Sequence, residues 1–264
     1  MKKFLILLVL AAVIGFLGWK TMRKEAVVEP TTNTATEVTP TSSIEGAALT
    51  NGDFKYEKKT DYVTFGATYP SKTGLTAEAD AKARLTMENW IKVQENQFAI
   101  DTKEMLDDRE MARLKETGRW YETGITYKKY SGGNNMISYV YQIYQDTGGA
   151  HPNGFFKTIT FDTTGNEVTL EGLFKPDARY LDVLSAKSKV LVIAELENRL
   201  GQKVDESIED WVRMGTAPSP EALQFFYLDG TNLVMIFPRY QVAAYAAGDF
   251  EARIPLSELS DILR

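Results

Sequence analysis

The 264-residue sequence contains no cysteine and a single histidine, His151. Without cysteine the chain can form no disulfide and carry no lipid on an N-terminal cysteine. One histidine leaves only carboxylates to complete a zinc shell, which normally takes three ligands rich in His or Cys. The nucleophile motif G-x-S-x-G is also missing, although a triad with Asp146 or Asp162 behind His151 is formally possible. We therefore predict no metal site, no cofactor and no catalytic residue.

Acidic residues are missing from residues 1–24, where five Lys and Arg flank an uninterrupted apolar run at 4–19. A signal peptide needs small residues at a cleavage site after its apolar run, and here the small residues fall inside the run. We therefore predict an uncleaved membrane anchor in residues 1–24, with a cleaved signal peptide as the alternative. Long domains translocate largely regardless of flanking charge. We expect a single-pass protein of the cell membrane with its C-terminal domain outside the cytoplasm.

Residues 25–50, EAVVEPTTNTATEVTPTSSIEGAALT, lack aromatic side chains and regular apolar spacing, which predicts a disordered Thr/Ser/Pro-rich linker. Because the first 24 residues carry five cations and no acid, the formal charge of −6 for the whole chain becomes −11 for the remainder. Such an acidic domain repels nucleic acid and anionic polymers and attracts cationic proteins; the alternative is that the charge only keeps the domain soluble.

Apolar patterning returns near Phe54 and predicts an α+β region with antiparallel sheets and packed helices. We divide it into a first lobe, residues 51–150, and a second lobe, residues 151–264. Strands and hairpins are expected at 63–69, 118–130 with 135–147, 155–170, and 223–242. Helices are expected after Thr76, over 101–113, and from Pro176 to Gly201, followed by a strand and a last helix within 250–263.

The stretch DTGGAHPNG, residues 146–154, predicts a tight connection between two strands. Gly148 and Gly149 permit backbone angles that are closed to other residues. Two roles stay open for His151: it either bridges backbone groups of neighbouring loops or forms a recognition surface with Asn153. These four residues are candidate binding residues.

Two tyrosines of the stretch PRYQVAAYAAG complete the candidate site. We expect Tyr240 to continue a strand into the core and Tyr245 to lie in a loop, where a stiff amphipathic ring suits contact with sugars or partner side chains. On the preceding hairpin, Tyr139, Tyr141 and Tyr144 are divided between the two faces of the sheet, so at least one should point outward.

The segments GGAHPN, FDTTGNEVTLEGLF and LVMIFPRYQVAAYAAGDFEARIPLSEL resemble, in this order, the RsiV-like extracytoplasmic domain-of-unknown-function family, over about residues 55–264. This resemblance implies an α+β cell-surface module that has no known chemistry of its own. In RsiV-like anti-sigma factors the module binds lysozyme, and similar modules accompany polysaccharide deacetylase domains.

Two features depart from these relatives. Only three residues precede the apolar run, so we expect no segment that holds a sigma factor. Polysaccharide deacetylases hold their metal with an aspartate and two histidines, whereas His151 is alone, so we expect no deacetylase domain.

Together these features predict a membrane-anchored binding or sensor module of the bacterial cell envelope that recognises a wall glycan such as peptidoglycan, or a cationic protein such as lysozyme. A carboxylate-dependent hydrolase of cell-wall polymers is the alternative, because two carboxylates suffice for glycoside hydrolysis. A plain envelope spacer also stays open. A common cleft lined by the GGAHPN loop and Tyr245 would favour the binding module.

Overall fold

The computed structural model describes residues 53–149 and 151–264. The expected anchor, with its apolar run at 4–19, and the expected linker at 25–50 lie outside the described residues. Within the two described ranges, no helix combines the length and the apolar character that crossing a bilayer requires.

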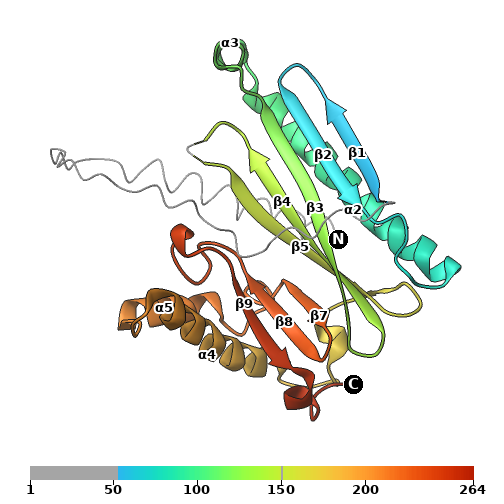
Figure 1. Ribbon diagram of the computed structural model, residues 1–264, viewed down its shortest axis with the longest axis vertical. Helices are drawn as coiled ribbons and strands as arrows, with labels where there is room; N and C mark the ends of the chain where they lie inside the picture. Colours follow the sequence, from blue (N-terminus) through green and yellow to red (C-terminus); the bar gives the residue numbers. More distant parts are fainter. Residues whose placement is uncertain (1–52, 150) are drawn as a thin grey trace. The chain divides into compact units, whose positions relative to one another are not determined.

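Six strands form a curved sheet in the order β1-β2-β3-β4-β5-β6 (Figure 1). Their bounds are β1 (Phe54–Lys59), β2 (Val63–Tyr69), β3 (Tyr121–Gly132), β4 (Met136–Asp146), β5 (Asn153–Phe161) and β6 (Glu167–Val168). Neighbouring strands are antiparallel except for β2 and β3, which run parallel. The expectation of antiparallel sheets was therefore incomplete: a long helical crossover separates β2 from β3, and such a crossover can return the chain in the same direction.

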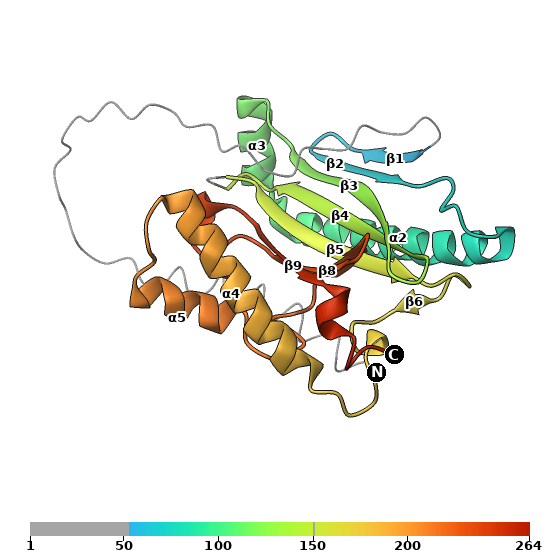
Figure 2. The same ribbon diagram turned by 60° about the horizontal axis from the view of Figure 1, so that its bottom comes forward.

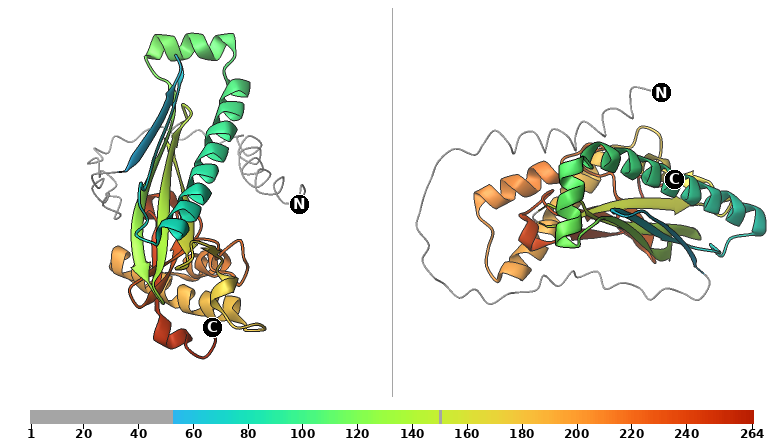
Figure 3. Two further views of the ribbon diagram at one scale, coloured as in Figure 1. Left: turned by 90° about the vertical axis from the view of Figure 1, so that its right-hand side faces the viewer. Right: turned by 90° about the horizontal axis from the view of Figure 1, so that it is seen from above.

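That crossover consists of α2 (Ala77–Met105) and α3 (Asp108–Thr117), and α2 lies along one face of the sheet (Figure 3). Its buried stripe includes Ala83, Met87, Ile91 and Phe98, as the helical spacing of these residues predicts. The expected second helix at 101–113 was misplaced. α2 continues to Met105, and α3 begins only after Asp107, whose carboxylate accepts a hydrogen bond from the N–H of Glu110.

A second sheet, of order β7-β8-β9, contains β7 (Phe226–Asp229), β8 (Asn232–Phe237) and β9 (Phe250–Pro255). Figure 2 shows α4 (Tyr180–Leu200) and α5 (Glu206–Gly215) beside it, and their apolar faces share one core with the sheet. α4 ends at Gly201 as expected, but it begins at Tyr180 instead of near Pro176. The expected last helix is only a 3-10 turn, Leu256–Leu259; two further 3-10 turns are Glu171–Leu173 and Tyr245–Ala247.

The second sheet packs on the face of the first sheet that α2 leaves uncovered. Val140 and Phe156 contact Tyr227 and other buried residues of β7 and β8. Two buried hydroxyls accept backbone hydrogen bonds across this junction: Ser138 from Leu228 at 3.0 Å, and Thr158 from Phe226 at 3.2 Å. Because β5 pairs with β4, the first sheet also continues past residue 150, where the two lobes were expected to divide.

Candidate functional site

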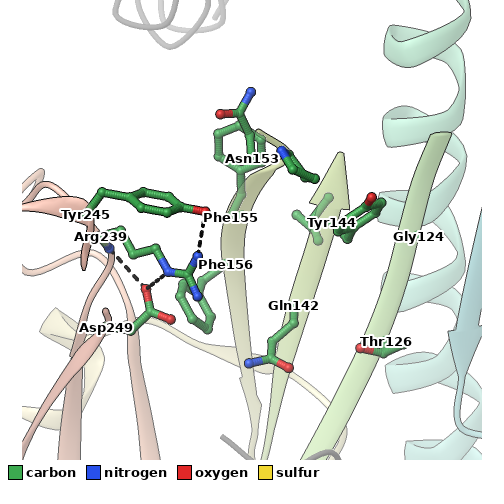
Figure 4. Close-up of a pocket in the computed structure, with 13 residues that line it drawn as sticks. Gly124, Thr126, Gln142, Tyr144, Asn153, Phe155, Phe156, Arg239, Tyr245 and Asp249 are labelled. Carbon is green, nitrogen blue, oxygen red and sulfur yellow. Dashed lines mark hydrogen bonds and ion pairs between the residues drawn. The ribbon is translucent and has the colours of Figure 1, made fainter. Parts of the chain in front are cut away.

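A cleft of about 400 Å³ opens where the second sheet stops covering β3, β4 and β5 (Figure 4). The strands contribute Thr126, Gln142, Tyr144, Asn153, Gly154 and Phe156 to its lining. The segment between β8 and β9 contributes Arg239, Tyr245 and Asp249. The GGAHPN loop and Tyr245 thus border the same cleft, since Pro152 and Asn153 also line it.

The ring of Tyr144 stands on the strand side of the cleft with 44% of its surface exposed. Its cross-strand neighbours are Gly124 on β3 and Gly154 on β5. Neither glycine has a positive φ, and a Cβ atom built on either one meets nothing within 4 Å. The backbone therefore does not require glycine at these positions. Because glycine has no side chain, Gly124 and Gly154 leave the two cross-strand sides of the Tyr144 ring bare. Glycine inside a strand often marks a place where another molecule approaches closely.

Arg239 faces the strands from the opposite side of the cleft (Figure 4). Its Nη1 donates to the Tyr245 hydroxyl at 2.8 Å, and its guanidinium carbon lies 4.7 Å from the centre of the Tyr245 ring. Asp249 Oδ1 accepts from the Arg239 backbone N–H at 3.0 Å and lies 3.8 Å from Nε. Burial raises the pKa of Asp249, while the backbone N–H and charge of Arg239 oppose that shift. The pair thus offers a ligand both donors and acceptors at little net charge.

His151 stacks on Tyr245, with ring centres 4.4 Å apart and 28° between the ring planes. The imidazole is exposed, and its Nδ1 donates to the carbonyl of the next residue, Pro152, at 3.0 Å. Two roles were expected for His151, a bridge between backbone groups of neighbouring loops or part of a recognition surface, and both stay predictions. The stacked ring connects the β4–β5 loop to the segment that carries Tyr245.

Gly148 and Gly149 lie in this loop and do not line the cleft, and Gly149 lacks the positive φ that would require a glycine. The N–H of Gly148 donates to Asp146 at 2.8 Å, and Asp146 forms an ion pair with Arg119 at 2.9 Å. Gly148 has φ +78°, and a Cβ there would lie 2.6 Å from the Arg113 guanidinium. Gly148 is therefore a positioning residue, because glycine alone adopts this conformation readily.

Tyr240 was expected in the core because it follows a predicted strand, but it does not lie there. It follows the end of β8, has φ +69° and is 51% exposed. A positive φ costs a residue with a side chain roughly 1–2 kcal/mol. Its ring centre lies 5.4 Å from that of Tyr245. Among the hairpin tyrosines, Tyr139 and Tyr141 are buried and only Tyr144 points outward, as expected for at least one of the three.

Sequence reasoning did not select Thr126, Gln142, Arg239 or Asp249. The first two follow from strand alternation, because they share a sheet face with Tyr144. No local pattern connects Arg239 with Asp249, since a turn and ten positions of sequence separate them. Within residues 53–149 and 151–264, no three His, Cys, Asp or Glu side chains are grouped in a way that could hold a metal ion.

Two family models match successive parts of the chain; the first match ends just inside β5, and the second begins shortly after β6. Residues 56–154 match a family model described as Deacetylase PdaC, and residues 171–257 match one described as Protein of unknown function (DUF3298). These matches support the domain-of-unknown-function family expected from the sequence. The narrower likeness to RsiV stays a prediction.

The chain is similar to the peptidoglycan-N-acetylmuramic acid deacetylase PdaC of Bacillus subtilis (strain 168), at 25% identity over 267 residues. The alignment covers 100% of this chain and 50% of the relative, so the chain spans about half the length of that protein.

Two crystal structures of DUF3298 family proteins are also similar to the chain. One, from Bacteroides fragilis NCTC 9343, has 18% identity and a TM-score of 0.52, covering 80% of this chain and 92% of the other. The other, from Pseudomonas aeruginosa PAO1, has 14% identity and a TM-score of 0.48, covering 80% and 93%. The first of these shows a shared fold.

Proposed function

We propose that this chain is an extracytoplasmic binding module of the cell envelope and that its cleft holds a segment of wall glycan. The observation that carries the proposal is the exposed ring of Tyr144, bare on both sides and opposed by Arg239 and Asp249. A sugar ring has apolar C–H faces and a rim of hydroxyl and amide groups. An aromatic platform faced by a few polar groups complements both features.

The charge of the cleft favours an uncharged sugar unit. Arg239 and Asp249 are its only charged lining residues among the described part of the chain, and they lie against each other. Thr126, Gln142 and Asn153 add neutral donors and acceptors. The formal charge of −11 after residue 24 disfavours polyanions, so the sugars proposed to lie in the cleft are the uncharged N-acetylglucosamine units of the wall backbone.

Binding, and not catalysis, is proposed because the cleft contributes one carboxylate. Glycoside hydrolysis of the usual kind takes two, on either side of the scissile bond. Peptidoglycan is proposed as the polymer because the similar Bacillus protein is named for acting on it, whereas its deacetylase activity is not proposed for this chain. A deacetylase metal site of the kind described above needs two histidines, whereas His151 is the single histidine of the chain and stacks on Tyr245.

The proposed location follows from the N-terminal sequence. Residues 4–19 are proposed to anchor the chain in the cell membrane, with residues 25–50 as a tether and the C-terminal domain on the outer side. Protease added to intact spheroplasts should then remove the domain while the N-terminal segment stays with the membrane fraction. Recovery of the full-length chain from the soluble cytoplasmic fraction would contradict this location.

A cationic protein such as lysozyme is the second candidate partner. Its support is the acidity of the chain after residue 24, together with the predicted likeness to RsiV. An association of this kind weakens steeply as salt is added, whereas binding of an uncharged sugar changes little.

Calorimetric titration with solubilised glycan strands, N-acetylglucosamine oligomers and lysozyme tests the proposal. We expect Tyr144→Ala to weaken binding of the glycan strands by about tenfold, as loss of a buried aromatic contact does. Phe54→Ala is the matched control, because Phe54 is a strand residue of nearly equal exposure, 43%, outside the cleft. Wild-type protein that binds no glycan, or equal losses in the two variants, would overturn the proposal. Salt-sensitive binding of lysozyme alone would favour the second candidate.

A further inference from the structure

A second group of exposed side chains lies next to the cleft and is formed by Trp211, Met214 and Tyr240, here called the outer ledge. Trp211 and Met214 are one turn apart on α5, and the exposed fractions of the three are 36%, 63% and 51%. The indole Nε1 of Trp211 donates to the carbonyl of Tyr240 at 3.1 Å, which connects the helix to the segment after β8.

The backbone of the outer ledge is held in an unfavourable conformation by several contacts. Tyr240 has φ +69°, although it carries a large side chain. The next side chain, Gln241, donates to the carbonyls of Gly215 and Ala222, each at 2.8 Å. A Cβ atom on Gly215 would lie 2.1 Å from the Gln241 carbonyl, so the end of α5 packs directly on this segment. Strain that surrounding contacts enforce in this way tends to occur at functional positions.

Stability alone does not account for a tyrosine at this position. Glycine or asparagine would adopt the same backbone with less strain, and the ring of Tyr240 is half exposed. What the tyrosine adds is an aromatic surface next to the cleft. Its ring meets that of Tyr245, a lining residue, at 5.4 Å and an angle of 40°.

We infer that the outer ledge is a second subsite for the same glycan strand, so that the ligand of this module is an extended polymer and not a single sugar or a short fragment. The strand leaves the cleft beside Tyr245, crosses the ring of Tyr240 and reaches Trp211. This inference rests on the proposed function and adds the length of the ligand to it. Successive exposed aromatic rings suit a chain of repeating sugar rings, because each unit repeats the same apolar face.

Dependence of affinity on ligand length tests the inference. The full-length chain, kept in solution with a mild detergent, is titrated with N-acetylglucosamine oligomers from two units upward and with solubilised glycan strands. In the wild type we expect affinity to rise by about tenfold between the shortest and the longest ligands, as two linked contacts act together.

The variant Tyr240→Asn removes the ring and keeps a residue that tolerates a positive φ. We expect it to bind the shortest oligomer as the wild type does and to lose the tenfold gain with long strands. Its melting temperature should be equal to that of the wild type or higher. Phe54→Asn is the matched control, because it removes a ring of similar exposure outside both subsites. The second variant, Met214→Asn, alters the ledge without touching the Trp211 hydrogen bond.

The possible results separate the inference from the proposed function. An unchanged length dependence in both ledge variants would overturn the inference and leave the proposed function intact. Equal weakening of short and long ligands would place Tyr240 within the cleft and would also overturn it. No binding of any sugar by the wild type would remove both. Sedimentation that shows a wild-type dimer, dissociated by Tyr240→Asn, would assign the ledge to a second copy of the chain and overturn the inference.

Discussion

Replacement of Gly124 by valine separates the stability of the sheet from the function of the cleft. Gly124 lies in the interior of β3, between Gly66 on β2 and Tyr144 on β4. Its φ is not positive, and a Cβ atom there meets nothing within 4 Å. Valine should therefore fit the strand without strain and project into the cleft beside the ring of Tyr144.

The expected change in stability is a gain. Glycine in a strand interior costs roughly 0.5–1 kcal/mol in conformational entropy relative to alanine. A β-branched residue opposite an aromatic ring on a neighbouring strand contributes roughly 0.2–1 kcal/mol more. The free energy of unfolding of Gly124→Val should thus exceed that of the wild type by about 1 kcal/mol. For a domain of this size the melting temperature rises by about 2–4 °C.

Glycan binding should change in the opposite direction, because the valine methyl groups occupy the space beside Tyr144. We expect an affinity at least about tenfold lower in calorimetric titration. Gly66→Val is the matched control: it lies in the same cross-strand row, its nearest neighbouring atom is 4.0 Å away, and it does not line the cleft. It should be stabilised without losing affinity.

Two results would refute this reasoning. Undiminished glycan binding by Gly124→Val would mean that the cleft is not the binding site. A Gly124→Val protein less stable than the wild type in urea unfolding would mean that the space beside Tyr144 is not open.

Three further predictions concern the framework around the cleft. Ser138→Ala should lower the free energy of unfolding, measured in urea, by about 1–3 kcal/mol, because it leaves the buried N–H of Leu228 without an acceptor. A loss below about 0.5 kcal/mol would contradict a stabilising role for the hydrogen bond between Ser138 and Leu228. The Arg113 guanidinium lowers the pKa of Glu110 from 4.5 to about 2. Glu110→Gln should therefore lower the free energy of unfolding by about 1 kcal/mol above pH 4.5, and by progressively less as the pH falls toward 2. A loss of stability that does not depend on pH would contradict the ion pair. Gly215→Ala should lower the free energy of unfolding by more than about 2 kcal/mol, because the new Cβ would lie 2.1 Å from the backbone carbonyl of Gln241. Thermal stability close to that of the wild type would show that the segment after β8 can shift.

Predictions that depend on neighbouring residues agreed best with the structure. The β3–β4 hairpin followed from alternating side chains around a turn, and the apolar stripe of α2 followed from its helical spacing. The end of α4 at Gly201 followed from the left-handed conformation that glycine adopts there. Each of these features is decided within a few residues, where turn chemistry and periodicity act.

Predictions that depend on distant parts of the chain were weaker. The parallel pairing of β2 with β3 requires knowledge of the path of α2 and α3, which no local pattern contains. Tyr240 was expected in the core because it follows a strand, yet contacts from α5 turn its backbone and expose its ring. His151 and Tyr245 were selected separately, and their stacking depends on how the second sheet packs against the first.

By itself, then, the amino-acid sequence determined the order and type of most strands and helices, the acidic charge, and the lack of thiols and of a histidine cluster, since these are properties of composition and of short segments. Only the tertiary structure brought Tyr144, Arg239 and Asp249 to one cleft. The physical reason is that the β3–β5 surface and the segment between β8 and β9 meet through buried contacts across the two sheets. The free energy of those contacts depends on the whole packed core and not on any single stretch of residues.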